Sequence, residues 1–270
     1  LHARKFINLM YVPIKKTLMT NQIIAGIHNY CDRWCERCTF TTRCAVYEGE
    51  ADLPPGELDM TNKAFWDRIS QNFVKAQEFL KKAAEEQGID LEAISSDMEE
   101  EFQRKESLEA EARKHPLARL SLEYSKVARD WLKTQPGMLE RLENLKTELV
   151  LGVESEDGAR KEAATIRDSI AVIQWYLVFI HVKLSRALIG KADKHSQDEG
   201  DDVPRDCDGS AKIAIIAVER SINAWAALFE ILPHQEDQFY NILGMLQKIK
   251  TTSIEEFPGG LSFVRPGFDD

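Results

Sequence analysis

Four cysteines lie within fourteen residues near the start of the chain. The segment HNYCDRWCERCTFTTRC contains Cys31, Cys35, Cys38 and Cys44, with three, two and five residues between successive cysteines. Thiolates are soft ligands, and four of them at this spacing suit zinc or an iron–sulfur cluster rather than magnesium or calcium. The segment therefore predicts a metal site with these four residues as ligands.

Two cofactors fit the four thiolates, and both alternatives stay open. Structural zinc sites usually take two cysteine pairs from well-separated turns, whereas four ligands from one tight segment suit a larger [4Fe–4S] cluster. We expect a helix over 21–38, which would place Cys31, Cys35 and Cys38 at i, i+4 and i+7 on one face. A short loop over 39–43 would then bring Cys44 back to them.

Neighbouring side chains fit a site of negative charge. His28 precedes Cys31 by one turn, where it can donate a hydrogen bond or replace a ligand; packing or surface exposure is the alternative. Trp34 can shield the site from water. Three basic residues can offset the charge of the thiolates, and they are Arg33, Arg37 and Arg43.

The spacing of Cys35, Cys38 and Cys44 resembles the end of the [4Fe–4S] loop in helix-hairpin-helix DNA glycosylases. That family has more residues before its second ligand, and the chain has no helix-hairpin-helix signature, so the resemblance implies a cluster without glycosylase activity. The whole motif also resembles bacterial helical proteins without an established activity, whose N-termini are similar to YCDRWCERC. The first three cysteines match the radical-SAM spacing, but Arg37 replaces the usual aromatic residue and no β/α-barrel pattern follows.

The elements that must hold this site are helical. Apolar residues recur at intervals of three and four after residue 19, and no strand pattern of useful length occurs. We predict an all-α helical bundle with a long central helix over about 157–190. Thr61 and Asn62 should cap a helix of about 25 residues that Gly88 ends. Further helices are expected over 90–115, 117–133, 138–150, 211–232 and 236–250.

The sequence divides into four parts. Residues 1–18 form a basic leader that we expect to be disordered or non-native, and 19–60 form the four-cysteine metal-binding segment. The helical bundle occupies 61–252 and includes an acidic linker over 191–209. An extended tail over 253–270 ends the chain.

Charge and composition restrict the partners. The chain has 35 Lys and Arg against 45 Asp and Glu, a net charge of -10, which opposes general binding to nucleic acid. We find no secretion signal and no apolar run of membrane length. Clustered thiols without a secretion signal indicate a cytoplasmic protein that ligates metal rather than forming disulfides.

A second candidate site lies on the predicted central helix. Arg167, Gln174 and His181 share a polar stripe that can line a small-molecule pocket, with a hydrogen-bonded network between helices as the alternative. We predict a non-enzymatic metal-binding protein whose site is structural or redox-sensing and whose bundle binds an unknown protein partner. The alternative is an iron–sulfur enzyme or electron-transfer protein that uses this pocket.

Overall fold

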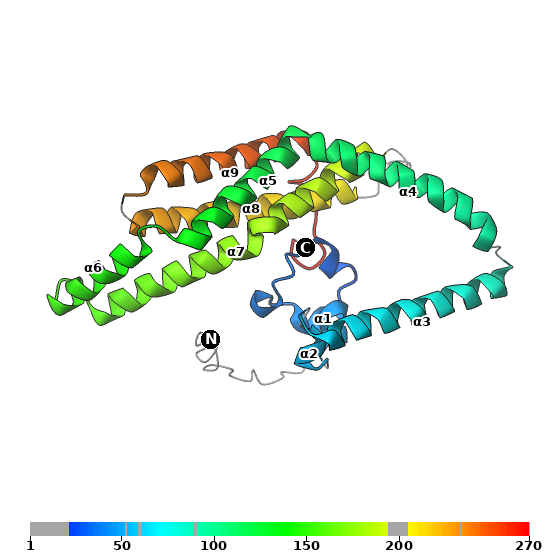
Figure 1. Ribbon diagram of the computed structural model, residues 1–270, viewed down its shortest axis with the longest axis horizontal. Helices are drawn as coiled ribbons and strands as arrows, with labels where there is room; N and C mark the ends of the chain where they lie inside the picture. Colours follow the sequence, from blue (N-terminus) through cyan, green and yellow to red (C-terminus); the bar gives the residue numbers. More distant parts are fainter. Residues whose placement is uncertain are drawn as a thin grey trace.

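The computed structural model describes residues 22–51, 53–58, 61–88, 91–193, 205–232 and 234–269. These residues form helices and turns, with no strand among them (Figure 1). The all-α prediction is therefore confirmed for this part of the chain. The leader over 1–18 and most of the acidic linker lie outside the described residues.

Four helices pack together as the body of the molecule. They are α5 (Pro116–Thr134), α7 (Glu156–Ala192), α8 (Asp206–Ile231) and α9 (Glu236–Glu256). The contact between α7 and α8 is the most extensive, while α5 packs against both α7 and α9. Large aromatic side chains fill the space between these helices, and Tyr124, Tyr176, Trp225 and Phe239 are fully buried.

Helix α7 spans 37 residues. It begins after Ser155, whose hydroxyl accepts a hydrogen bond from the Gly158 amide, as expected for an N-cap. Its length and composition would allow it to cross a membrane, but core helices of water-soluble proteins meet the same criterion. Because α7 also buries Ile173, Ile180 and Leu184 between its neighbours, its composition is weak evidence for a membrane span.

Helices α3 (Lys63–Gln87) and α4 (Leu91–Lys114) connect the cysteine segment to the bundle. Figure 1 shows α3 reaching away from the bundle and α4 returning to α5. The predicted limits of α3 are confirmed: Asn62 caps its start and Gly88, at a φ of 66°, caps its end. Two short helices, α1 (Ala45–Ala51) and α2 (Pro55–Leu58), precede it, and α6 (Met138–Val150) joins α5 to α7.

Helix α8 begins before its predicted start. The sequence predicted Ser210 as the cap, whereas the helix begins at Asp206 and buries Cys207, Gly209 and Ser210. Asp206 and Asp208 lie in the first turn, where their charges interact favourably with the helix dipole. The prediction of a linker reaching residue 209 is therefore wrong.

The C-terminal tail folds back onto the bundle. Helix α9 continues to Glu256, beyond the predicted end at 250, and residues 257–269 form a series of turns rather than an extended segment. Lys212 on α8 holds these turns through the Phe263 carbonyl and through Asp269, at 2.9 Å. The tail also reaches the cysteine segment, where Phe268 packs against Phe40.

Candidate functional site

The cysteine segment is built from turns and not from the predicted helix. The segment contains three short 3-10 turns, η1 (Ile27–Tyr30), η2 (Cys35–Arg37) and η3 (Thr41–Arg43), which are joined by short irregular connections. Gly26 and Arg33 have positive φ angles of 72° and 58°, which a right-handed helix cannot accommodate. The Asp32 carboxylate also accepts a hydrogen bond from the Trp34 amide, a local turn that competes with helix formation. The helix predicted over 21–38 is therefore wrong.

The turns bring the four cysteines to one small cavity of about 20 Å³. Cys31 follows η1, Cys35 and Cys38 flank η2, and Cys44 follows η3. None of the four is in a disulfide. As the side chains stand, the described residues contain no group of three or more His, Cys, Asp or Glu arranged to hold a metal ion.

The thiols have surroundings that a metal site can use. The Phe40 amide donates a hydrogen bond to Cys38 Sγ at 3.4 Å. Burial raises the pKa of Cys35, and the neighbouring thiols of Cys31 and Cys38 raise it further. Four thiols are a donor set whose chemistry fits a soft cation, which would replace their protons on binding.

Three of the predicted neighbours border the cysteine cavity. His28, Arg33 and Trp34 line it together with the cysteines. Arg43 lies elsewhere, because its Nε donates to the Gln22 carbonyl at 3.2 Å. Of the three predicted arginines, Arg33 lines the cavity, and Arg37 and Arg43 do not.

Arg37 and Trp34 attach the segment to α7. The Arg37 guanidinium lies 3.8 Å from the centre of the Trp34 ring, and Trp34 stacks on Trp175 with ring centres 4.9 Å apart. Arg37 also forms an ion pair with Asp168 at 2.6 Å. Both predicted residues thus belong to the contact between the cysteine segment and the bundle.

Asp32 is the main polar connection between the segment and the bundle, and the sequence analysis missed it. Its Oδ2 accepts hydrogen bonds from the Tyr176 hydroxyl and from Arg220 Nη1, each at 2.6 Å. Its backbone carbonyl accepts from Trp175 Nε1 at 2.9 Å. Burial and the hydrogen bond to Asp32 raise the pKa of Tyr176 above its ordinary value. An aspartate in a charged segment gives no signal until α7 and α8 lie beside it.

The two ends of the described chain pack against each other. Phe40 meets Phe268 with ring centres 5.0 Å apart, and Tyr30 meets Phe263 at 4.6 Å. The Tyr30 hydroxyl donates to Asp206 at 3.0 Å, and burial together with this acid raises the pKa of Tyr30 to about 12. The tail therefore covers one side of the cysteine segment.

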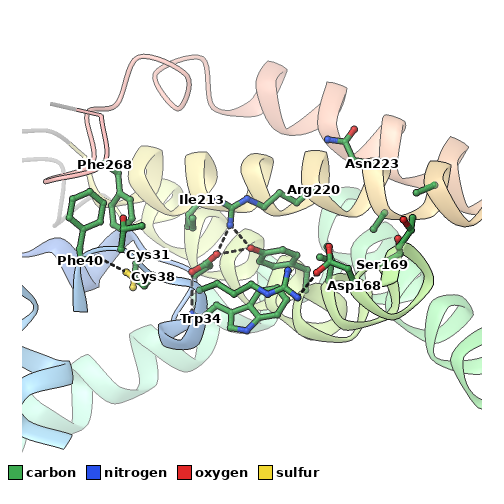
Figure 2. A pocket seen from close by; sticks show the side chains of 18 of the residues that line it. Cys31, Trp34, Cys38, Phe40, Asp168, Ser169, Ile213, Arg220, Asn223 and Phe268 are labelled. Carbon is green, nitrogen blue, oxygen red and sulfur yellow. Dashed lines mark hydrogen bonds and ion pairs between the residues drawn. The ribbon is translucent and has the colours of Figure 1, made fainter. Parts of the chain in front are cut away.

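A larger cleft of about 810 Å³ adjoins the cysteine cavity. Its walls come from the cysteine segment, α7, α8 and the tail (Figure 2). Cys31 and Cys38 border both spaces. The cysteine segment is thus part of the cleft wall.

The predicted pocket residues lie on other parts of α7. Arg167 and Gln174 are exposed, and half-buried His181 contacts Ser121 of α5 at 3.0 Å. None of the three lines the cleft, which uses a different face of α7 that includes Asp168 and Ser169. The His181–Ser121 contact corresponds to the alternative of a hydrogen bond between helices.

Comparison with known proteins gave no match. No protein-family model, curated protein or solved structure matches the chain. Function is therefore inferred from the contacts and the chemistry of the described residues.

Proposed function

We propose that Cys31, Cys35, Cys38 and Cys44 bind one zinc ion that has a structural role. The observation that carries this proposal is the cavity that all four cysteines share. Four thiolates complete the tetrahedral ligand shell of one zinc ion and leave no open position, as in structural zinc sites. A [4Fe–4S] cluster, which also takes four thiolates, is the alternative.

The cysteine segment has little hydrophobic core, which favours a structural role for the metal. Among the side chains described over 22–50, only Ile27 is fully buried, so the turns have little hydrophobic core of their own. Metal binding supplies folding energy to such segments, because thiolates that would otherwise be separate are held together. Binding would require the four thiols to turn toward the shared cavity and to lose their protons.

Elemental analysis of the purified chain and of Cys35→Ser tests this role. We expect one zinc per chain in a colourless protein, loss of zinc in Cys35→Ser, and an intact helical bundle by circular dichroism. Cys207→Ser is the matched control, because Cys207 lies on α8 outside the cysteine cavity. A brown protein bleached by dithionite would replace zinc with an iron–sulfur cluster, whereas unchanged metal content in Cys35→Ser would exclude this site.

We also propose that α3 is an interaction helix that pairs with a second copy of the chain. Trp66, Phe73 and Leu80 are 57%, 68% and 61% exposed. They recur every seven residues, so they form one stripe of the kind that pairs helices in coiled coils. Contiguous exposed apolar side chains are typical of interaction surfaces, and the identical helix of another copy offers a matching stripe.

Sedimentation velocity over a range of concentrations tests the pairing. We expect a dimer that dissociates when Phe73 and Leu80 are both replaced by glutamate. Val150→Glu is the control, since Val150 is an exposed apolar residue at the end of α6, remote in sequence from this stripe. A wild-type chain that stays monomeric at all concentrations would exclude the dimer.

A further inference from the structure

We propose that the large cleft binds a small organic carboxylate with an apolar body. Its volume of about 810 Å³ lies within the range of about 300–1,000 Å³ that ligand sites occupy. The cleft is formed where four separate parts of the chain meet, and such junctions favour binding sites. This inference goes beyond the metal site, although the cysteine segment borders both the cavity and the cleft.

The cleft is more basic than the rest of the molecule. Arg37, Arg220 and Arg265 line it, whereas Asp32 and Asp168 are its acidic residues. Elsewhere the balance is reversed, because the chain has 45 acidic residues against 35 basic ones. Each of the three arginines is paired with an acid, Arg37 with Asp168, Arg220 with Asp32 and Arg265 with Asp269. The attraction for an anionic ligand therefore comes from guanidinium N–H donors that these pairs leave unused.

Arg220 supplies the anchor for the carboxylate. Its Nη1 donates to Asp32 Oδ2 and to the Tyr176 hydroxyl, while its Nε and Nη2 have no partner among the described residues. An arginine edge with two parallel N–H donors matches the two oxygens of a carboxylate. Asp32 and Tyr176 hold the guanidinium in place beforehand, which reduces the ordering cost of binding.

Ser169 marks the other end of the cleft. Its side chain is mostly buried, at 5% exposure, and it lines the cleft. A hydroxyl at this position can form a hydrogen bond with a polar group of a bound ligand. Figure 2 shows Ser169 and Asn223 near the end of the cleft that lies away from the cysteines, with Arg220 between.

Small apolar residues leave room for the body of the ligand. Ala164 and Val172 of α7 border the cleft opposite Ala224 and Ala227 of α8. Side chains of this size create the space between two closely packed helices, and their methyl groups can cover an apolar chain or ring. The ligand therefore places its carboxylate at Arg220 and its body along these residues.

Isothermal titration with 3-phenylpropanoate and octanoate tests the site. Their primary amides serve as neutral controls of the same shape. We expect both acids to bind with dissociation constants of about 1 mM or tighter, and the amides to bind at least about tenfold more weakly. Binding no tighter for the acids than for the amides would overturn the proposal, as would no binding of the acids at about 10 mM.

A variant that fills the cleft gives a second criterion. Ala227→Leu should weaken acid binding at least about tenfold, because its side chain occupies the space for the apolar body without touching an ion pair. Arg167→Gln is the control, since Arg167 is exposed outside the cleft. Undiminished binding in Ala227→Leu would overturn the proposed location. Zinc analysis of the same samples reports separately on the metal site.

Discussion

At the scale of single residues, Asp32 connects the cysteine segment to the bundle. One carboxylate oxygen receives the Tyr176 hydroxyl and the Arg220 guanidinium from two different helices. Its other oxygen orders the following turn by accepting from the Trp34 amide. A single side chain thus sets the local conformation of the segment and also its position on the bundle.

Replacing Asp32 by asparagine should loosen the cysteine segment without unfolding the bundle. Loss of the charged acceptor costs about 1–2 kcal/mol, a modest value because Arg220 is half exposed to solvent. Hydrogen exchange should show faster exchange at backbone amides such as that of Ile24, which donates to the Arg43 carbonyl. Glu36→Gln is the control, and equal protection in Asp32→Asn would contradict this role.

His181 makes the stability of the bundle depend on pH. Burial lowers the pKa of His181 below its ordinary value of 6.5. The unfolded chain therefore takes up this proton before the folded chain does, so the contribution is complete above about pH 6.5 and declines as the pH falls. Urea unfolding at about pH 7.5 and about pH 5.5 should show a larger loss of stability in the wild type than in His181→Asn. Equal losses would contradict this assignment.

At the scale of elements, the start of α8 is fitted closely to the two chain ends. A side chain at Gly209 would collide with the rings of Tyr30 and Phe263, so glycine lets all three elements meet. Gly244 on α9 has no neighbouring atom within 4 Å of such a side chain. Both glycines lie in helices, but close contacts with neighbouring rings require a glycine at 209 and not at 244.

Alanine substitutions should separate these two glycines. Gly244→Ala should stabilise the chain by about 0.5–1 kcal/mol, because alanine loses less backbone entropy in a helix. Gly209→Ala should destabilise it by about 1–3 kcal/mol, because the aromatic rings must move. Urea unfolding measures both changes, and stabilisation by Gly209→Ala would show that the rings shift without cost.

At the scale of the whole molecule, the cysteine segment borders two adjacent spaces. It forms the cysteine cavity, and Cys31 and Cys38 also border the large cleft. The tail closes the arrangement through Phe40 and Phe268, which both line the cleft. Ordering the segment at one site therefore orders part of the other.

Metal removal should weaken ligand binding to the cleft. We expect a chelator to lower the affinity for 3-phenylpropanoate, because the freed segment must be ordered again when the ligand binds. Thermodynamic linkage then requires the same carboxylate to raise the affinity for zinc by an equal factor. Calorimetric titration of the carboxylate with and without zinc measures the first effect, and titration of zinc with and without the carboxylate measures the second. Equal carboxylate affinity with and without zinc would show that the sites are independent.

Local sequence patterns predict most of the helices but not the turns around the cysteines. Asn62 and Gly88 delimit α3 because caps act on the adjacent backbone and leave a signature in sequence. The cysteine segment adopts turns because Arg33 has a positive φ and Asp32 bonds to distant helices. The repeat of apolar residues along a helix carries no information about those contacts.

The sequence by itself determined the helical character of the described residues and the close spacing of four cysteines, since composition and spacing are local properties. Only the tertiary structure decided which side chains meet at a site. Arg167 and Asp168 are adjacent in sequence, yet only Asp168 faces the cleft, because side chains one residue apart on a helix point in directions about 100° apart. The position of α8 and of the tail then brings Arg220 and Phe268 to the same cleft, a consequence of packing between residues far apart in the chain.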